Sequence, residues 1–360
     1  MNSDDKFLAV CMPAFNAEKF VKKAIQSILS QSFGHFTFII TDDASTDETL
    51  KVLRKISDPR VHVFENRLNQ GAVATRNDMM RYCIDEGFKY MAVMDADDIA
   101  YPDRIRKQIE ILEGDSSLTV CGSSMRVESN SSVWRAPKYS HEIKAECVFA
   151  NPLPVSTVTM RLRDVEKYSL YWDANYAPCA DYHLWYVMLF QHNLLARNTG
   201  DIDMVYSFSS DGISFGRGIG QQEKKDAMIK ELILNDLGIF PAAEELNSFM
   251  RVALSRSRSA LDASGFCDVA IALKNQKRAI VDQRALEKAL NHRVNIYLGT
   301  VSSIGSELKQ KMIMHLASDQ SYSKLESVLR RVKYTYLNRW FPRISYSLSL
   351  LYRRLKDGRN

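Results

Sequence analysis

At 360 residues, with 46% hydrophobic and 25% charged side chains, the chain has the composition of a globular protein with one large or two medium domains. The formal net charge of +5 is unevenly placed: residues 321–360 carry ten Lys or Arg against two acids, which leaves the first 320 residues at −3. A weakly acidic body lacks the broad basic surface of a nucleic-acid-binding protein, so we expect no nucleic-acid partner.

The six cysteines are scattered, with no Cys-x-x-Cys pair. This pattern is typical of reduced core thiols in a cytosol and not of a disulfide framework or a zinc site. No apolar run approaches the roughly 18 residues of a spanning helix, and the N-terminus has no basic segment followed by an apolar one. We therefore expect a cytoplasmic protein with neither a signal peptide nor a membrane-spanning helix.

Short apolar runs alternate with helical periodicity in the first part of the chain. Strands are predicted at Phe7–Met12, Phe36–Thr41, Val61–Phe64 and Tyr90–Met94. Helices are predicted over residues 20–29, 50–56 and 72–85, with Asn16 as the N-cap of the first. This order predicts an α/β fold with a mainly parallel, Rossmann-like sheet, helices on both faces and right-handed crossovers.

Polar clusters follow the predicted strands. They are Asn16, Asp42 with Asp43, the Asn69–Gly71 turn and the Asp95–Asp98 run. Because the carboxyl ends of parallel strands meet at one edge of the sheet, we expect these clusters to share a ligand-binding rim. The absence of a Gly-x-Gly-x-x-Gly motif after the first strand, and of a Walker A lysine, argues against a dinucleotide or P-loop fold.

The second half of the chain changes character. Strands at Val155–Met160 and Met204–Phe208, with a helix at Asp181–Gln191 between them, predict a mixed half that completes the same domain. Beyond Gln221 the pattern is helical. We expect a domain at residues 1–218, a helical C-terminal region at 219–320 and a basic amphipathic tail at 321–360.

Three carboxylates, Asp95, Asp97 and Asp98, follow the strand that begins at Tyr90. Clustered carboxylates repel one another unless a cation or a helix N-terminus offsets their charge, and Mg²⁺ or Mn²⁺ takes one or two carboxylates together with substrate phosphates. The residues alone leave two interpretations open. One is a metal-diphosphate site, and the other is an acidic loop that caps the next helix, with Pro102 in its first turn.

Five ordered motifs carry a resemblance to a known family. They are Met12-Pro-Ala-Phe-Asn16, Ile28-Leu-Ser-Gln-Ser-Phe33, Thr41-Asp-Asp-Ala-Ser-Thr-Asp47, Asn69-Gln-Gly71 with Thr75-Arg-Asn77, and Met94-Asp-Ala-Asp-Asp98. Their order and spacing resemble those of inverting family 2 glycosyltransferases of the bacterial surface-polysaccharide type, which have a GT-A fold. The resemblance implies transfer of a sugar from a nucleotide-diphosphate sugar, expected to be a UDP-sugar, to a hydroxyl of a glycan or lipid-linked acceptor.

The resemblance also implies roles for residues that bind the donor. Asp43 would accept a hydrogen bond from the imide N–H of a uracil or thymine base, and Pro13 and Phe15 would pack near that base, with Asn16 beside them. Arg76 would face the diphosphate at the start of its helix, where the helix dipole also favours anions.

A second group of residues would carry the chemistry. Asp95 would contact the ribose, and Asp97 together with Asp98 would hold the divalent cation, Mn²⁺ or Mg²⁺, that bridges the phosphates. Asp181 matches the family's general base, which deprotonates the acceptor hydroxyl. If Asp181 is not the base, it is the N-cap of the helix that follows it.

Three positions depart from the family. Ala180 stands where an acid usually precedes the base, Val155 replaces a histidine, and Ser209 replaces a late histidine for which His183 or Asp211 is a nearby substitute. These departures motivate one alternative, a catalytically degenerate nucleotide-sugar-binding paralogue. A metal-dependent nucleotidyltransferase is another, but it would place a Gly-rich basic loop after the first strand, and this chain has none there.

The C-terminal tail has a pattern of its own. Residues 328–356 combine aromatic and leucine side chains with Arg and Lys, and Pro342 divides them into two amphipathic segments. Such segments are typical of helices that lie on an anionic membrane, so we expect a peripheral location on the inner face of the plasma membrane. The alternative is that the apolar face packs on the protein body or on a second subunit in a homodimer.

Overall fold

The computed structural model describes residues 6–207, 219–253, 262–275 and 280–300. The segment at 328–356, Ser209, Asp211 and the expected boundary at residue 218 lie outside the described residues. The chain divides into two compact units, Met1–Phe240 with Gln276–Ala289, and Pro241–Asn275 with Leu290–Asn360. All of the expected site residues belong to the first unit.

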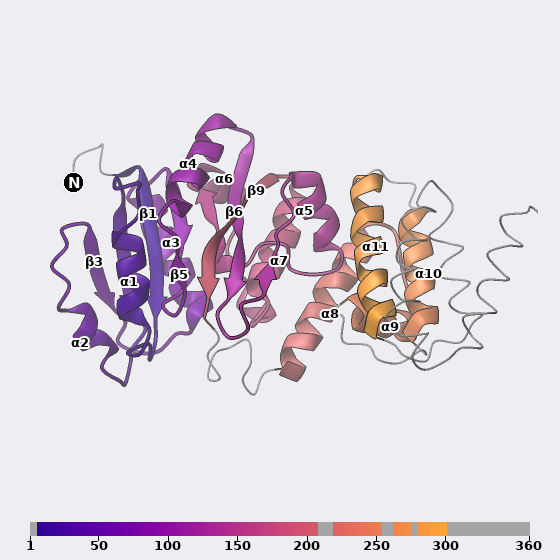
Figure 1. Ribbon diagram of the computed structural model, residues 1–360, viewed down its shortest axis with the longest axis horizontal. Helices are drawn as coiled ribbons and strands as arrows, with labels where there is room; N and C mark the ends of the chain where they lie inside the picture. The colour runs from indigo at the N-terminus through magenta and orange to yellow at the C-terminus, as the bar shows by residue number, and fades with distance from the viewer. Residues whose placement is uncertain (1–5, 208–218, 254–261, 276–279, 301–360) are drawn as a thin grey trace, which may run out of the picture. The chain divides into compact units, whose positions relative to one another are not determined.

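A nine-stranded mixed sheet is the centre of the first unit (Figure 1). Its strands are β1 (Leu8–Ala14), β2 (Thr37–Asp42), β3 (Val61–Glu65), β4 (Tyr90–Val93), β5 (Ile99–Ala100), β6 (Leu118–Val127), β7 (Val133–Trp134), β8 (Thr159–Arg161) and β9 (Leu195–Tyr206). The hydrogen-bonded order is β3-β2-β1-β4-β8-β6-β9-β5, with β7 paired to β6.

The first four strands are parallel to one another where they pair, and the later strands make the sheet mixed. β8 runs antiparallel to both β4 and β6, whereas β6 and β9 are parallel and lie side by side in Figure 1. The expected α/β architecture with a mainly parallel first half is therefore confirmed.

Helices connect the strands. Those of the first unit are α1 (Val21–Leu29), α2 (Thr49–Leu53), α3 (Ala72–Asp85), α4 (Arg104–Gly114), α5 (Ser140–Cys147), α6 (Leu162–Tyr168), α7 (Ala180–Tyr186) and α8 (Ile219–Asp236). In the second unit, α9 (Ala243–Ala253) packs on α10 (Asp262–Lys274), and the residues of α11 (Gln283–Thr300) are divided between the units. Within the described part of the chain, no helix is long and apolar enough to cross a membrane.

The core explains why the strands of the first half were readable from the sequence. β2 and β4 are buried at every position, and β1 is buried except at Pro13. Helix α1 covers this layer with one apolar face, formed by Val21, Ala24, Ile25 and Ile28. A strand buried on both sides appears as a continuous apolar run, and a covering helix shows a 3.6-residue period.

Two local predictions are wrong. Asn16 does not cap α1, because that helix begins at Val21 and Phe20 occupies the N-cap position without a side-chain hydrogen bond. The segment Val155–Met160 is not one strand: Val155–Thr157 forms a 3₁₀ turn in which Thr157 Oγ1 donates to Pro154 O at 2.7 Å, and β8 begins only at Thr159. A hydroxyl that bonds to the backbone a few residues away competes with strand pairing.

Candidate active site

The carboxyl ends of β1, β2 and β4 meet at one edge of the sheet. Ala14 at the end of β1 is in register with Asp42 at the end of β2, and Cys11 is in register with Val93, the last residue of β4. The segments that follow these strands therefore leave the sheet side by side. They carry Phe15 and Asn16, Asp43, and the acidic loop, which we define as Asp95–Asp98.

Asp43 is buried and anchors the loop that leads into α3. Its Oδ1 accepts hydrogen bonds from Asn66 Nδ2 at 2.7 Å and from Gln70 N at 3.0 Å, and its Oδ2 accepts from Gly71 N at 2.8 Å. Gly71 has φ +84°, a left-handed conformation that favours glycine. Asp43 thus fixes the start of the helix that carries Arg76, and its carboxylate keeps lone-pair capacity for another donor.

Asn16 joins the loops after β1 and β2. It has a left-handed φ of 49°, and its Oδ1 accepts from Thr46 N at 2.8 Å while its own N–H donates to Ser45 Oγ at 3.1 Å. An asparagine tolerates this conformation because its short side chain bonds locally. Phe15, the residue before it, is 47% exposed and leaves a flat aromatic face open at the rim.

Arg76 is the centre of the charged part of the site. It lies in the second turn of α3, and its Nη2 pairs with Asp95 Oδ1 at 2.5 Å. The positive charge of Arg76 also acts on Asp97 and Asp181, where it opposes the rise in the pKa of each carboxyl. Residues from three distant parts of the sequence therefore share one electrostatic environment.

Asp97 and Asp98 differ in surroundings. Burial, together with the charge of Asp95, raises the pKa of Asp97 to about 6. Burial and the charges of Asp95 and Asp97 also raise the pKa of Asp98, which is fully buried, accepts a hydrogen bond from Ser207 N at 3.0 Å and is hydrogen-bonded by Ser156. Asp98 is thus committed to contacts inside the fold, whereas Asp97 is partly exposed.

The chemistry of this donor set fits a hard divalent cation that is shared with a ligand. Carboxylate oxygens are the ligands preferred by Mg²⁺ and Mn²⁺, and Asp97 lies close enough to Asp95 for their charges to interact. In the described part of the chain, no three His, Cys, Asp or Glu side chains form a group that could hold a metal. Two carboxylates fill part of the coordination shell of Mg²⁺ or Mn²⁺, and such ions commonly take their other ligands from water and substrate phosphates.

Asp181 lies in the first turn of α7. Its Oδ2 accepts a hydrogen bond from Asn151 Nδ2 at 2.7 Å, and its Oδ1 accepts from Tyr182 N at 2.9 Å. Burial raises the pKa of Asp181, and these hydrogen bonds oppose that rise. A half-buried carboxylate with raised basicity and a fixed orientation suits proton abstraction.

His183 packs against a neighbouring aromatic ring. Its ring stacks on Tyr176 with centroids 3.7 Å apart and an interplanar angle of 9°. Burial lowers the pKa of His183, so the imidazole is neutral at pH 7. Ala180, just before Asp181, is buried and its methyl side chain offers no carboxylate beside Asp181.

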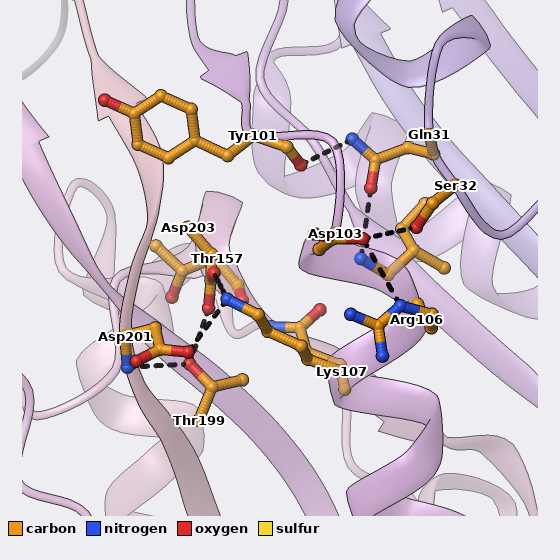
Figure 2. A network of polar contacts seen from close by, with 12 residues as sticks. Gln31, Ser32, Tyr101, Asp103, Arg106, Lys107, Thr157, Thr199, Asp201 and Asp203 are labelled. Carbon is orange, nitrogen blue, oxygen red and sulfur yellow. Dashed lines mark hydrogen bonds and ion pairs between the residues drawn. The ribbon is translucent and has the colours of Figure 1, made fainter.

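The segment after the acidic loop is tied to α1 and β9. In Figure 2 the side-chain amide of Gln31 points toward the backbone carbonyl of Tyr101, whose ring points away, and Gln31 Nε2 donates to Tyr101 O at 2.8 Å. Gln31 Oε1 also accepts from Ile105 N at 3.1 Å. In the same view Lys107 pairs with Asp201 and Asp203 of β9, each at 2.8 Å. These contacts fix the backbone on the far side of the loop.

Three supporting residues had no role in the sequence interpretation. Gln31 and Asn77 lie inside recognised motifs, and Asn77 turns out to bond Trp172, with its Nδ2 donating to Trp172 O at 2.8 Å and its Oδ1 accepting from Trp172 N at 3.0 Å. Arg104 follows Pro102 and looked like an ordinary residue of the first helical turn. A polar residue at a position where the helical period predicts burial was the one available signal.

The chain is similar in sequence to known glycosyltransferases. The model described as "Glycosyl transferase family 2" matches residues 9–170. An uncharacterised glycosyltransferase of Haemophilus influenzae is 30% identical over 192 residues, which are 49% of this chain and 58% of that protein. The Escherichia coli protein WfgD, named UDP-Glc:alpha-D-GlcNAc-diphosphoundecaprenol beta-1,3-glucosyltransferase, is 27% identical over 216 residues, 59% of this chain and 81% of WfgD.

The fold has a counterpart among solved structures. TarS of S. aureus in complex with UDP-GlcNAc superposes with a TM-score of 0.54 at 15% sequence identity, covering 81% of this chain and 91% of that one. This likeness confirms the expected GT-A fold. The chain spans less than two thirds of the Haemophilus relative, so the similarity with that protein concerns one part of it.

Proposed function

Since residues 9–170 of this chain belong to glycosyl transferase family 2, we propose that the protein is an inverting glycosyltransferase. It moves a sugar from a nucleotide-diphosphate sugar to a hydroxyl group of a glycan or lipid-linked acceptor. The observation that carries this proposal is the convergence of Asp95, Asp97 and Asp181 around Arg76 at the carboxyl edge of a parallel sheet. An anion-binding arginine next to a cation-binding carboxylate and a base is what transfer from a diphosphate requires.

The donor is a UDP-sugar in this proposal. The exposed ring of Phe15 and the half-buried Pro13 form an apolar surface for a base, and the Asp43 carboxylate, beyond its bonds to the 66–71 loop, accepts the imide N–H of uracil. Asn16 keeps the two loops together around that base. WfgD, which is named for UDP-Glc, supports uracil over guanine.

Binding of the diphosphate changes the partners of Arg76. Arg76 is paired with Asp95 in the structure, and an incoming diphosphate offers its guanidinium additional charge-assisted bonds while Asp95 turns to the ribose. Asp97, beside Asp98, provides the protein ligand for Mn²⁺ or Mg²⁺, and a bound cation would offset the charge that develops on the leaving diphosphate.

Asp181 acts as the general base. The acceptor oxygen attacks the anomeric carbon from the face opposite the diphosphate, so that the new C–O bond forms as the bond to the phosphate oxygen breaks and the configuration inverts. The hydroxyl proton passes to Asp181, and the nucleoside diphosphate leaves with the bonding electron pair. Asn151 keeps the carboxylate oriented through its bond to Oδ2.

The acceptor is proposed to be lipid-linked. The name of WfgD specifies a diphosphoundecaprenol acceptor, and the tail at 328–356 combines aromatic and basic residues in a way that suits an anionic bilayer. We therefore place the enzyme at the inner face of the plasma membrane, where such acceptors are extended.

A donor screen tests the proposal. Purified protein is incubated with UDP-, dTDP- and GDP-sugars in the presence of Mn²⁺, and released nucleoside diphosphate is measured. We expect release from a UDP-sugar that is lost in EDTA and in the Asp181→Asn variant. Nucleotide binding without release, under conditions in which an acceptor extract is supplied, would instead identify a non-catalytic paralogue.

A further inference from the structure

A buried arginine, Arg104, connects the segments on either side of the acidic loop. Arg104 is the first residue of α4 and is 0% exposed. Its Nη2 donates to Val93 O at 2.7 Å, and Val93 is the last residue of β4, two positions before Asp95. The side chain thus reaches from the helix after the loop to the strand before it, and it joins the two ends of the loop.

The charge of Arg104 is not neutralised by a direct partner. Its Nη1 contacts the sulfur atoms of Met94 at 3.4 Å and Met204 at 3.3 Å, its Nε has no hydrogen-bond partner, and it makes no ion pair with any carboxylate of the described residues. Burial lowers the pKa of Arg104 to about 10, against the charges of Asp203, Asp98 and Asp95, so the group stays cationic at neutral pH.

Nη2 of Arg104 also donates to Val158 O at 3.4 Å, and burying a cation among thioethers and carbonyls is costly unless nearby anions balance it. Of the acids whose charges act on Arg104, Asp203 already has Lys107 at 2.8 Å. Asp98 is 0% exposed, and its Oδ2 has no hydrogen-bond partner. The positive charge of Arg104 therefore acts on the carboxylates of the acidic loop, Asp95 and Asp98.

We propose that Arg104 is a positioning residue for the acidic loop: fixed at Val93 O, its guanidinium supplies the permanent positive charge that holds the loop carboxylates in their binding arrangement before any cation arrives. Only the link between Arg104 and metal binding rests on the proposed function. The arrangement of the loop itself can be tested without any ligand.

The first test measures backbone hydrogen exchange by mass spectrometry in the full chain without ligand. Arg104→Met removes the charge and leaves a side chain that suits the neighbouring methionines. We expect peptides covering residues 95–100 and Ser207 to exchange about tenfold faster or more, because one charge-assisted hydrogen bond and its charge balance are lost. Arg104→Lys keeps the charge and should stay close to wild type.

The matched control is Arg161→Met. Arg161 is also buried, but it bonds Leu118 O, Leu112 O and Tyr90 Oη at the opposite end of β4. Its removal should lower global stability without selective exchange at residues 95–100. A double variant, Arg104→Met with Asp98→Asn, removes both buried ionisable groups and should restore protection of the loop.

The second test measures Mn²⁺ binding in the presence of UDP by calorimetry. If Arg104 positions the loop, Arg104→Met should bind Mn²⁺ more weakly. If Arg104 acted only as a nearby positive charge, its removal should make Mn²⁺ bind more tightly. The proposal is overturned if the loop of Arg104→Met exchanges as in Arg161→Met, if Arg104→Lys behaves like Arg104→Met, or if Mn²⁺ binds more tightly. If Arg104→Met does not fold, the proposal is also overturned when the double variant, Arg104→Met with Asp98→Asn, does not fold either.

The two tests separate the inference from the function on which its metal link rests. If wild type binds no Mn²⁺ with UDP, the proposed function fails, and the exchange measurement still decides the role of Arg104.

Discussion

Replacing Asp97 with asparagine should make the protein more stable and less active at the same time. Burial and the charge of Asp95 raise the pKa of Asp97 from its usual 3.8 to about 6. A shift of this size corresponds to about 3 kcal/mol by which ionised Asp97 destabilises the fold at pH 7, as an upper limit for a partly exposed group.

The sign follows from proton binding. The folded protein holds the Asp97 proton more tightly than the unfolded chain does, so the cost is fully present above pH 6 and disappears as pH falls toward 3.8. The amide of the asparagine variant never ionises, so the substitution removes the cost at every pH. With about 2–4 °C per kcal/mol for a domain of this size, the melting temperature at pH 7.5 should rise by several degrees.

The assay is thermal unfolding of ligand-free Asp97→Asn and wild type between pH 5 and 8, where the gain should shrink at the acid end. Asp58→Asn is a control of opposite sign, because Arg60 lowers the pKa of Asp58 to about 2 and its neutralisation should destabilise. The same Asp97→Asn protein should lose Mn²⁺-dependent nucleotide binding. Destabilisation by Asp97→Asn would refute the reasoning, since it would mean that the carboxylate is a structural cap.

Three further predictions concern the donor, the base and the tail. Arg76→Met should raise the KM for the nucleotide sugar by about tenfold or more, through loss of a charge-assisted bond to the diphosphate, and an unchanged KM in steady-state kinetics would count against it. Asp181→Asn should keep donor affinity by calorimetry and lose about two decades or more of kcat, whereas normal turnover would leave Asp181 as a structural residue of the first turn of α7, whose N-cap is Cys179. A chain ending at Ser327 should lose salt-sensitive co-sedimentation with anionic liposomes, since each basic residue contributes up to about 1 kcal/mol there. Equal, salt-insensitive partitioning of the two chains would point to packing or a dimer.

The parallel half of the fold was predictable because each of its elements carries a local signal. β1 and β4 are continuous apolar runs, and β2 has an apolar centre at Phe38–Ile40. The polar residues that follow these strands lie at one edge because the strands are parallel. The place of Arg76 at this edge was implied by the family resemblance, whereas its pairing with Asp95 came only from the structure. The rim could therefore be assembled from sequence before any contact was known.

The antiparallel half gave weaker signals. β6 was missed because Gly122, Ser123 and Ser124 interrupt its apolar pattern, and those small residues serve tertiary packing: a Cβ at Gly122 would collide with Asn198 Oδ1. The buried position of Asp98 and the reach of Arg104 to Val93 depend on how α4 packs against β6, β8 and β9, which no local pattern encodes. The sequence therefore indicated an acidic cluster and could not distinguish its inward carboxylate from its outward one.

The proposed transferase activity is tested most directly by nucleoside diphosphate release from UDP-sugars by wild type, Asp97→Asn and Asp181→Asn, each with Mn²⁺ and with EDTA. We predict Mn²⁺-dependent release by wild type, loss of that release in Asp97→Asn together with loss of UDP binding, and loss in Asp181→Asn with UDP binding intact. Equal release by all three proteins, or release by wild type that is indifferent to EDTA, would contradict it.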